Sequence, residues 1–433
     1  MQRRTFLQAG PAALAGARAL SGANDRIRVA VIGLGWRGGD HMDILSRIPG
    51  VEVATFCDVD EERLNKRAAE FESRTGRRPR LEPDLRRVLD DRGIDAVTIA
   101  TCNHWHVPAG IWACQAGKHV YVEKPLAHNV WEGRQLVTAA RRYHRIVQGG
   151  TQKRSNGYVR RAIQALKEGA IGDVYMARSV HFQVRDSLGF KPPEPPPAGL
   201  HWDLWLGPAP EQPFHRNLVH YNWHWFWDFG GGELANNGIH MLDVARWGLG
   251  LGVPSRVHAT GGRFGYQDQG QTPNTLVATW EYSGGVQLVA EIRGRYTPLE
   301  AGMHSGVTFF GSKGYLVGDW SKRSRFQLYL GKDTTPEPDL GRLDDVDRAD
   351  DDQLSHFQNF FDAIRAQKRE MLTAEVAETH LSTVIALTGN ISYRLGRKLQ
   401  FDPASERFPG DSEADALLRR AYRSPYAVPD LAA

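Results

Sequence analysis

The sequence predicts an α/β fold class, with an N-terminal domain built on a parallel sheet and a C-terminal α+β domain built on an open, mostly antiparallel sheet. Short β-branched runs alternate with amphipathic stretches from residue 27 to about residue 150. Longer runs of alternating polar and apolar residues follow over 174–330. The length of 433 residues also fits two or three domains, at roughly 150 residues each.

The first region is expected to fold as repeated strand–helix units. Its apolar runs lack strict alternation, which is typical of strands buried on both faces of a parallel sheet. Strands that alternate with helical stretches indicate βαβ units. The expected strands are 28–32, 51–56, 96–100, 119–122 and 145–147, and the expected helices are 39–47, 61–75, 84–90, 107–116 and 131–144.

The second region is expected to form an antiparallel sheet with one face on helices. Polar–apolar alternation favours this half-buried arrangement, and turn signals such as Ser283-Gly284-Gly285 separate the runs. A Pro-rich loop is expected at 192–197 and a solvated acidic loop at 344–352. The expected strands are 174–184, 256–264, 276–282, 286–293, 307–317 and 326–330, and the expected helices are 159–168, 353–369 and 374–395.

Composition places the chain among ordinary globular proteins. Hydrophobic residues make up 41% and charged residues 24% of the sequence, which argues against a disordered chain or a membrane bundle. Basic residues outnumber acidic ones by only 54 to 50 and are scattered, so no nucleic-acid partner is expected. The three cysteines, Cys57, Cys102 and Cys114, cannot form a disulfide framework.

The strongest local motif is a glycine-rich turn directly after the first expected strand, Gly33-Leu34-Gly35-Trp36-Arg37-Gly38. Gly33 permits a tight turn, Gly35 lets the backbone approach a pyrophosphate, and Gly38 lets the helix pack closely. The helix N-terminus then faces the phosphates, with Trp36 and Arg37 beside them. Asp58 ends the second strand, 20 residues after Gly38. A carboxylate there accepts hydrogen bonds from ribose hydroxyls and repels a 2′-phosphate, which favours NAD over NADP.

A second motif, Glu123-Lys124-Pro125, follows the expected strand at 119–122. Open parallel sheets bind ligands outside the carboxyl ends of their strands, so Lys124 is expected at the nicotinamide. Its ammonium could stabilise the alkoxide that hydride transfer generates, and partial burial would lower its pKa toward the working range. The alternative is a surface lysine held by Glu123.

These motifs, together with Thr101-Cys102-Asn103-His104-Trp105-His106 and Ala116-Gly117-Lys118-His119-Val120, resemble the glucose–fructose oxidoreductase/inositol dehydrogenase (Gfo/Idh/MocA) family. The resemblance implies a Rossmann domain joined to an open antiparallel sheet. It implies NAD(P)-dependent oxidation or reduction of sugars, cyclitols and their derivatives, in a homodimer or homotetramer. It also implies that Thr101, Asn103, His106, Glu123 and Lys124 contact the cofactor.

A glycine-rich loop leads into a helix at Gly230–Asp243 and extends the resemblance into the second domain. Asn236, His240 and Asp243 are spaced i, i+4, i+7, so they are expected on one helical face. His240 is the candidate general base, with Lys124 and Asn236 as the other catalytic candidates. Asp243 could orient the imidazole or form a structural pair. The family usually has aspartate at the position of Asn236, and an amide can only position a hydroxyl.

The segment from His220 to Asp228 is dense in aromatic residues, which suits stacking against a carbohydrate ring or, alternatively, core packing. Tyr221, Trp223 and His224 are candidate substrate contacts, as are Asn236, Asp243, Lys153 and Arg154. His220 and His224 have the helical metal spacing, but no third ligand is evident, so no metal is expected. His380 is expected to face solvent.

Residues 1–23 resemble a twin-arginine export signal, because Arg3-Arg4 precede a short Ala/Gly/Leu stretch. Export to the periplasm with a cofactor already bound is therefore expected; the alternative is a frayed basic N-terminus on a cytoplasmic protein. The stretch is shorter than the about 20 apolar residues of a membrane span, and no other segment is long and apolar enough. The expected domains are then 24–150 for NAD, 151–401 for substrate and oligomerisation, and an extension at 402–433 that wraps the surface.

Three functions compete. The first is a periplasmic NAD-dependent oxidoreductase that acts on a small sugar, polyol or sugar derivative. The second is a glycoside-cleaving enzyme that uses tightly bound NAD in an oxidation–elimination–reduction cycle; the Tyr-Pro-Thr-His signature of family 109 glycoside hydrolases is absent from the sequence. The third is a non-catalytic sugar- or NAD-binding protein, against which the presence of both Lys124 and His240 argues.

Overall fold

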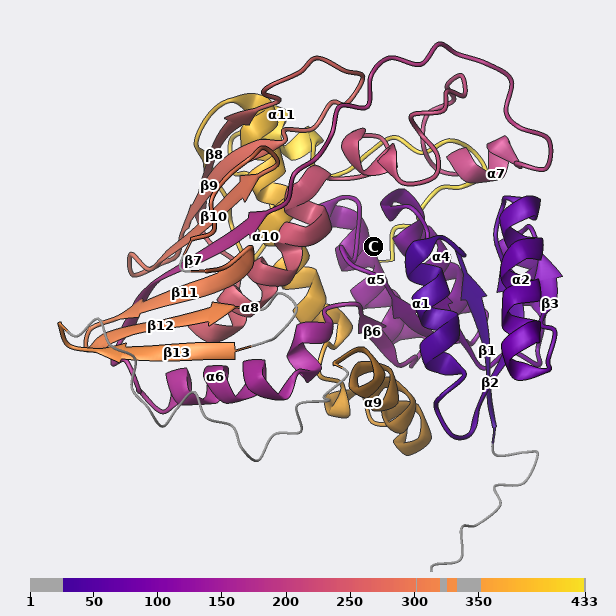
Figure 1. Cartoon of the computed structure of the whole chain (residues 1–433), viewed down its shortest axis with the longest axis horizontal. Coiled ribbons are helices and arrows are strands. Elements are labelled where there is room, and N and C mark those ends of the chain that lie inside the picture. Colours follow the sequence, from indigo (N-terminus) through magenta and orange to yellow (C-terminus); the bar gives the residue numbers. More distant parts are fainter. Residues whose placement is uncertain (1–25, 301, 320–324, 333–351, 432–433) are drawn as a thin grey trace, which may run out of the picture.

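The computed structural model describes residues 26–300, 302–319, 325–332 and 352–431. They form two sheet-based domains that lie side by side (Figure 1). The predicted fold class is confirmed, because a parallel Rossmann-type sheet is followed by a mixed, mostly antiparallel one. The predicted signal at 1–23 and all of the acidic run except Asp352 lie outside the described residues.

The first sheet contains six parallel strands in the order β3-β2-β1-β4-β5-β6. This is the strand order of a dinucleotide-binding Rossmann sheet. Buried aliphatic residues on both faces hold the helices against it. The strands are β1 (Ile27–Ile32), β2 (Val51–Cys57), β3 (Arg80–Glu82), β4 (Ala96–Ile99), β5 (His119–Val122) and β6 (Val147–Gly149). The helices are α1 (Trp36–Leu45), α2 (Glu61–Thr75), α3 (Leu85–Asp90), α4 (Asn103–Gln115) and α5 (Val130–Arg142).

Two of these helices begin earlier than the sequence predicts. The helix α1 begins at Trp36 rather than at residue 39, so its first turn belongs to the glycine-rich motif. The helix α4 begins at Asn103 rather than at residue 107 and carries Pro108 in its interior. Proline lacks the amide hydrogen of a helix interior, which is why the sequence places the helix start next to it.

The second sheet has eight strands in the order β13-β12-β11-β7-β10-β9-β8-β14. Only the central pair β7–β10 is parallel among the described pairings. The run predicted as one strand at 307–317 is a hairpin, which turns at Ser312-Lys313. The strands are β7 (Val174–Phe182), β8 (Arg256–Gly262), β9 (Thr275–Glu281), β10 (Gln287–Arg293), β11 (Ser305–Gly311), β12 (Gly314–Asp319), β13 (Arg325–Leu330) and β14 (Leu399–Gln400).

Helices cover the face of this sheet that is turned toward the first domain (Figure 1). The helix α10 packs against α5 of the first domain and against α8 and β8 of the second, and thus joins the two. The helix α9 follows the second sheet in sequence but packs into the core of the first domain. These helices are α6 (Gly157–Lys167), α8 (Ile239–Leu249), α9 (Asp352–Ala366), α10 (Val376–Leu395) and the short α11 (Ser412–Ala416).

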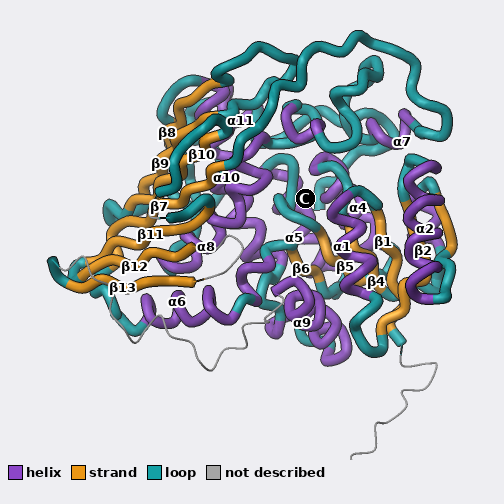
Figure 2. Tube along the Cα trace, viewed as in Figure 1, coloured by secondary structure: helices purple, strands orange, loops and turns teal. Residues whose placement is uncertain are grey.

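The connection between β7 and α8 is long and mostly loop (Figure 2). Its residues 187–229, here named the strap, include α7 (Trp202–Leu206) and pass over the first domain near α2 and α4 (Figure 1). The strap has a hydrophobic cluster of its own, made of Leu200, Trp205, Leu206, Ala209, Phe214, Leu218, Trp223, Trp225, Phe226 and Phe229. Much of the aromatic segment therefore serves as core.

In the part of the chain that the structure describes, no helix combines the length and the apolar character needed to cross a bilayer.

Candidate active site

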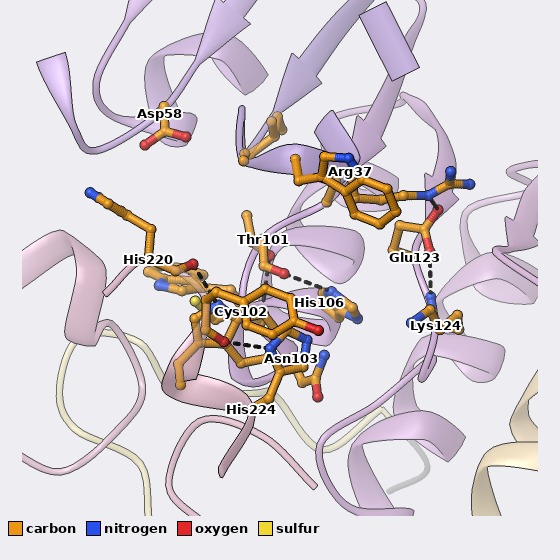
Figure 3. Close-up of a pocket in the computed structure, with 18 of the residues that line it drawn as sticks. Arg37, Asp58, Thr101, Cys102, Asn103, His106, Glu123, Lys124, His220 and His224 are labelled. Atoms are coloured by element: carbon orange, nitrogen blue, oxygen red, sulfur yellow. Dashed lines mark hydrogen bonds and ion pairs between the residues drawn. The ribbon is translucent and has the colours of Figure 1, made fainter. Parts of the chain in front are cut away.

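A cavity of about 430 Å³ lies at the carboxyl ends of the first-domain strands. Residues from both domains, from the strap and from the C-terminal tail line it. Asp58 and His220 lie toward one end of the cavity, and Lys124 and Glu123 lie toward the other (Figure 3). This is the edge where open α/β sheets bind their ligands.

The glycine-rich turn has the geometry that a dinucleotide cradle requires. Gly33 has φ +84°, and a Cβ there would lie 2.6 Å from the carbonyl oxygen of Ala100. A Cβ on Gly38 would lie 1.8 Å from the carbonyl oxygen of Gly33, so α1 can pack on the turn only with glycine there. Among the described residues, no side chain caps the N-terminus of α1 at Gly35, which leaves its amide groups for a pyrophosphate.

Asp58 lies at the end of β2 and lines the cavity. Its Oδ2 accepts a hydrogen bond from the amide of Leu34 at 2.6 Å, and its Oδ1 accepts one from the amide of Asp60 at 3.0 Å. Burial raises the pKa of Asp58, while the nearby Arg63 guanidinium and these two amides oppose the rise. The carboxylate is thus fixed in place for a ribose, and the residues present fit NAD.

A buried ion pair joins the glycine-rich turn to the loop that carries Lys124. Arg37 donates from Nε to Oε1 of Glu123 at 2.6 Å, and Nε2 of His41 lies 3.0 Å from the same oxygen. Burial alone would raise the pKa of Glu123, but Arg37 and His41 hold this pKa well below its usual range. Glu123 and Arg37 line the cavity, and their pairing fixes the loop that carries Lys124.

The turn after β4 also lines the cavity, at Thr101, Asn103 and His106. Nδ1 of His106 lies 2.7 Å from the carbonyl oxygen of Pro125, and its Nε2 lies 3.2 Å from that of Thr101. Both ring nitrogens thus face backbone carbonyls, so His106 joins this turn to the Lys124-Pro125 loop.

Lys124 reaches across the domain junction. Its Nζ donates to the carbonyl oxygen of Asn236 at 2.9 Å and to Oδ1 of Asn236 at 3.1 Å. Burial lowers the pKa of Lys124 to about 8, with Glu123 opposing this change and Arg37 adding to it. The sequence-predicted catalytic candidates of the two domains thus meet in one place.

Asn236 and His240 both line the cavity. Asn236 belongs to a π-helical turn, Leu234–Gly238, that runs directly into α8. The Nδ2 of Asn236 and the Nδ1 of His240 are buried and have no hydrogen-bond partner among the described residues. Burial, reinforced by the charge of Lys124, holds the pKa of His240 well below its usual range. His240 is therefore a neutral imidazole at neutral pH.

Asp243 and Arg154, two predicted substrate contacts, do not line the cavity. Arg154 donates from Nε to both carboxylate oxygens of Asp243, at 3.0 and 2.9 Å, and Ser382 of α10 donates to Oδ1 at 2.6 Å. A buried carboxylate needs such a cationic partner. Of the three residues expected on one helical face, Asn236 and His240 line the cavity and Asp243 does not.

The other predicted substrate contacts line the cavity: Lys153, Tyr221, Trp223 and His224. The ammonium of Lys153 lies 3.0 Å from Oδ2 of Asp352. The ring of His224 stacks on Trp223 with centroids 3.6 Å apart, and its Nδ1 lies 2.6 Å from the carbonyl oxygen of Tyr221. Tyr221 is 42% exposed and lines the cavity.

The expectation that His380 faces solvent is wrong. His380 is 0% exposed, and its Nε2 lies 2.9 Å from Oε1 of Glu406, a residue of the C-terminal tail. The tail supplies this buried partner, and the helical pattern of α10 alone gives no sign of it.

Several cavity residues were not predicted from the sequence. His181 of β7 and Ser305 of β11 meet at 2.6 Å between Nδ1 and Oγ, and Asn237 lies nearby on the π turn. Tyr426 comes from the C-terminal tail. Strand pairing and tail docking bring these residues together, and no local sequence pattern marks them. Among the residues with described positions, no group of three His, Cys, Asp or Glu side chains could hold a metal ion.

Comparison with known protein families finds a match for both domains. Residues 27–151 match the family described as "Oxidoreductase family, NAD-binding Rossmann fold" (GFO_IDH_MocA). Residues 182–295 and 334–428 match its C-terminal alpha/beta domain.

Among curated relatives, inositol 2-dehydrogenase 2 of Saccharopolyspora erythraea is 29% identical over 268 residues, which cover 61% of this chain and 66% of that protein. A glycosyl hydrolase family 109 protein of a Shewanella species is 34% identical over 122 residues, which cover 27% of each chain. The chain thus spans less than two thirds of the length of these relatives.

Solved structures match over nearly the whole fold. The WlbA dehydrogenase of Bordetella pertussis, in complex with NADH and UDP-GlcNAcA, has a TM-score of 0.66 at 20% identity, and the match covers 87% of this chain and 99% of that one. A levoglucosan dehydrogenase in complex with NADH and levoglucosan gives the same TM-score, identity and coverage. The predicted family and its NAD-binding Rossmann domain are confirmed. The chain belongs to the GFO/IDH/MocA oxidoreductase family, and its first domain matches that family's NAD-binding Rossmann fold.

Proposed function

We propose that this enzyme transfers hydride between a nicotinamide dinucleotide and a hydroxyl-bearing carbon of a sugar, polyol or sugar derivative. One observation carries the proposal. Lys124 meets Asn236 at the cavity, beside His240, and two buried nitrogens of that group have no hydrogen-bond partner in the described chain. A bound dinucleotide supplies the hydride acceptor or donor.

Lys124 supplies charge where the reaction creates it. Hydride loss from a carbinol carbon leaves a carbonyl, and the reverse step passes through alkoxide character at oxygen. An ammonium held in advance by Asn236 stabilises that oxygen without further reorganisation. With a pKa of about 8, Lys124 is mostly protonated at neutral pH.

His240 manages the hydroxyl proton in this proposal. Its low pKa keeps the imidazole neutral, so it can accept a proton from a substrate hydroxyl. Neighbouring Lys124 lowers the pKa of His240, because its positive charge opposes a second positive charge on the imidazole.

Asn236 positions the substrate and carries no proton. Its Oδ1 is occupied by Lys124, while its buried Nδ2 is free to donate to a substrate oxygen. An aspartate at this position would supply a second hydrogen-bond acceptor in place of the donor, together with a negative charge. Asparagine instead supplies one acceptor and one donor with no charge.

A carbohydrate suits the rest of the cavity. Tyr221, which is 42% exposed, offers an aromatic ring, and His181, Ser305 and Asn237 offer polar groups from the opposite sheet and the π turn. The names of the relatives, inositol dehydrogenase and levoglucosan dehydrogenase, point to the same substrate class.

The test is a panel of polyols, aldoses and glycosides, incubated with the purified enzyme and scored for reduced nicotinamide and for released aglycone. Reduction by at least one polyol or sugar supports the proposal. Aglycone release without net reduction would favour the glycoside-cleaving alternative, for which the structure offers no observation of its own. If no compound of the panel reacts although the dinucleotide is bound, the non-catalytic alternative is favoured.

We further propose export by a twin-arginine route, on the strength of Arg3-Arg4 and the short apolar stretch that follows. Arg3→Lys combined with Arg4→Lys is expected to strand the protein in the cytoplasm. An unchanged periplasmic yield would contradict this proposal.

We also propose a homodimer or homotetramer. The outer face of the second sheet carries no helix in the described chain (Figure 1) and exposes apolar residues such as Val277, which is 41% exposed. Val277→Asp is expected to lower the molar mass measured by light scattering. A monomeric parent protein would contradict the proposal.

A further inference from the structure

We infer that Glu233 presets one wall of the cavity as a pair of hydrogen-bond acceptors, so that the enzyme selects substrates with a free hydroxyl that donates a hydrogen bond from a carbon other than the reacting one. The wall consists of Asn237 and Ser305, and Glu233 acts on Ser305 through His181. Glu233 is a positioning residue, since it does not itself line the cavity. The inference rests on the proposed function for the substrate class, but its own subject is selectivity.

Glu233 is a buried carboxylate directly before the π turn. It is 3% exposed, and Arg185, in the loop after β7, donates to it from Nε to Oε2 at 2.9 Å and from Nη2 to Oε1 at 3.1 Å. Burial alone would raise the pKa of Glu233, but His181 and Arg185 hold this pKa well below its usual range. Glu233 is therefore an anion at neutral pH, and its oxygens only accept hydrogen bonds.

The charge of Glu233 fixes which way the amide of Asn237 faces. Nδ2 of Asn237 donates to Oε1 of Glu233 at 2.6 Å and to Oε1 of Gln183 at 3.3 Å. The reversed amide would set its own oxygen against an oxygen anion, so electrostatic repulsion excludes it. Because both hydrogens of Nδ2 are used, Oδ1 is the atom with which Asn237 can bind a ligand in the cavity, and this atom is an acceptor.

The neighbouring amide, that of Asn236, is fixed in the opposite sense. The ammonium of Lys124 donates to Oδ1 of Asn236 at 3.1 Å, and the buried Nδ2 has no hydrogen-bond partner among the described residues. Two adjacent asparagines thus offer opposite groups, a donor from Asn236 beside the cation and an acceptor from Asn237 beside the anion. Because the reacting oxygen accepts from Lys124 and Asn236 in the proposed function, the acceptor on Asn237 serves a different hydroxyl.

The second acceptor of the wall depends on the tautomer of His181. Its Nε2 lies 3.2 Å from Oε1 of Glu233, although it has no partner with hydrogen-bond geometry among the described residues. A lone pair on Nε2 would face this anion and be repelled. Arg185 already balances the charge of Glu233, so a neutral imidazole suffices, in which one nitrogen donates and the other accepts. The hydrogen is therefore on Nε2, and Nδ1 is the acceptor.

Ser305 carries this polarity to the cavity. Ser305 of β11 and His181 of β7 are opposite each other in the antiparallel pairing, and Oγ of Ser305 lies 2.6 Å from Nδ1 of His181. Because Nδ1 accepts, the hydroxyl of Ser305 donates to it. A hydroxyl has one hydrogen to donate and two lone pairs, so Oγ is left as an acceptor for a ligand in the cavity, which Ser305 lines. Both wall residues therefore present acceptors.

The wall lies close enough to Lys124 to contact the same substrate molecule. Asn237 is adjacent in sequence to Asn236, whose carbonyl oxygen accepts from Nζ of Lys124 at 2.9 Å. Burial lowers the pKa of Lys124, and the charge of Glu233 is among those that oppose this change, so Glu233 and Lys124 are electrostatic neighbours. A sugar or polyol held at one carbon by Lys124 and Asn236 thus has the wall available for a hydroxyl on another carbon.

The first experiment measures selectivity by binding and needs no turnover. D-Glucose and myo-inositol, each with its monodeoxy and monodeoxyfluoro derivatives, are titrated calorimetrically into the full-length protein loaded with NADH. A fluorine atom cannot donate a hydrogen bond. At a carbon that faces the wall, we expect both replacements to weaken binding about tenfold. The inference is overturned if the fluoro derivatives bind like the parent compound at every carbon, or if neither parent compound binds.

Ser305→Ala assigns the effect to the wall. The variant lacks one acceptor, so the penalty for the deoxyfluoro derivative should disappear at one carbon and persist at the reacting carbon. Ser179→Ala is the matched control, because Ser179 lies on the same strand as His181 and is 3% exposed but does not line the cavity. This control should keep every ratio of affinities at the parent value. Unchanged ratios in Ser305→Ala would overturn the inference.

Glu233→Gln tests the positioning role. A merely structural role would weaken the parent sugar and its fluoro derivatives alike and leave their ratio unchanged. We expect the ratio to fall at the carbon that Ser305→Ala identifies, because the charge that orients both wall residues is gone. An unchanged ratio in Glu233→Gln would remove Glu233 from the inference.

Nitrogen NMR of the histidine-labelled protein tests the polarity directly and needs no ligand. The signals of His181 are assigned by their loss in His181→Gln. We expect the hydrogen on Nε2 in the parent protein. A hydrogen on Nδ1, alone or together with one on Nε2, would turn the hydroxyl of Ser305 toward the cavity as a donor and would overturn the inference. This measurement decides the matter even if Glu233→Gln does not fold.

Selectivity and chemistry fail separately. If the titrations show the expected donor requirement but no polyol or sugar transfers hydride, the inference stands and the proposed function falls. If a polyol is oxidised and Ser305→Ala leaves every ratio of affinities unchanged, the proposed function stands and the inference falls.

Discussion

The two ends of the cavity differ in how their polar groups are satisfied. The adenosine end is the one at Asp58. There, the oxygens of Asp58 accept hydrogen bonds from backbone amides, and the neighbouring backbone pairs with the strap. At the reacting end, the buried Nδ2 of Asn236 and Nδ1 of His240 have no hydrogen-bond partner in the described chain. Buried polar groups are normally paired. The difference indicates that one end is built to hold a ligand and the other is kept ready to react with one.

The largest effect is expected at the holding end, from Gly38→Ala. The added methyl group would lie 1.8 Å from the carbonyl oxygen of Gly33, so α1 or the turn must move. Dinucleotide content is expected to fall below detection, together with a lower melting temperature. Gly252→Ala, where a Cβ meets nothing within 4 Å, is the control. Full dinucleotide content in the Gly38→Ala protein would contradict the claim that this end of the cavity holds the dinucleotide.

Next in size are Lys124→Ala and His240→Ala at the reacting end. Loss of a prearranged electrostatic partner costs about 10²–10³ in rate, and loss of a general base about 10²–10⁴. Each variant should therefore lose at least about a hundredfold in turnover while its dinucleotide content stays at the parent level. If either variant lost dinucleotide as well, the two ends would not be separable.

A smaller effect is expected from Asp58→Ala. The ribose hydroxyls lose their acceptor and a 2′-phosphate loses its repulsion, so NAD should bind more weakly and discrimination against NADP should shrink. Calorimetric titration of dinucleotide-free protein measures both affinities. Tighter binding of NADP than of NAD by the parent protein would refute the role assigned to Asp58.

The smallest effect is a shift in pH dependence. Reduction of a carbonyl needs protonated Lys124 in this account, so activity should fall as pH rises through its pKa of about 8. Asn236→Asp places a carboxylate beside Nζ, now 3.1 Å from Oδ1, and should raise that pKa. The alkaline limb should then move to higher pH. An unmoved limb would mean that another group titrates there.

The sequence predicts the two ends unequally. Gly33, Gly38 and Asp58 could be placed because a tight turn and a ribose acceptor are demanded by local backbone geometry. Asn236 and His240 could be found by motif, but the same motif also added Asp243, whose partners Arg154 and Ser382 lie far away in the sequence.

The remaining parts depend on contacts between distant segments. The ion pair of Arg154 with Asp243 joins positions 89 residues apart, and Tyr426 reaches the cavity from the C-terminal tail. The docking of the strap on the first domain depends on pairings such as Asp60 with Leu200. Periodicity and motif spacing report only on neighbours in sequence, so none of these contacts could be predicted.

The most direct test of the central claim follows the hydride itself. Inositol and hexitols that carry deuterium at their carbinol carbons are incubated with the purified enzyme, and the dinucleotide is then analysed by mass spectrometry. The account predicts deuterium in the reduced dinucleotide with the parent protein and little with Lys124→Ala or His240→Ala. Deuterium that stays in the polyol or passes to the solvent, while product forms, would contradict the claim that this cavity transfers hydride.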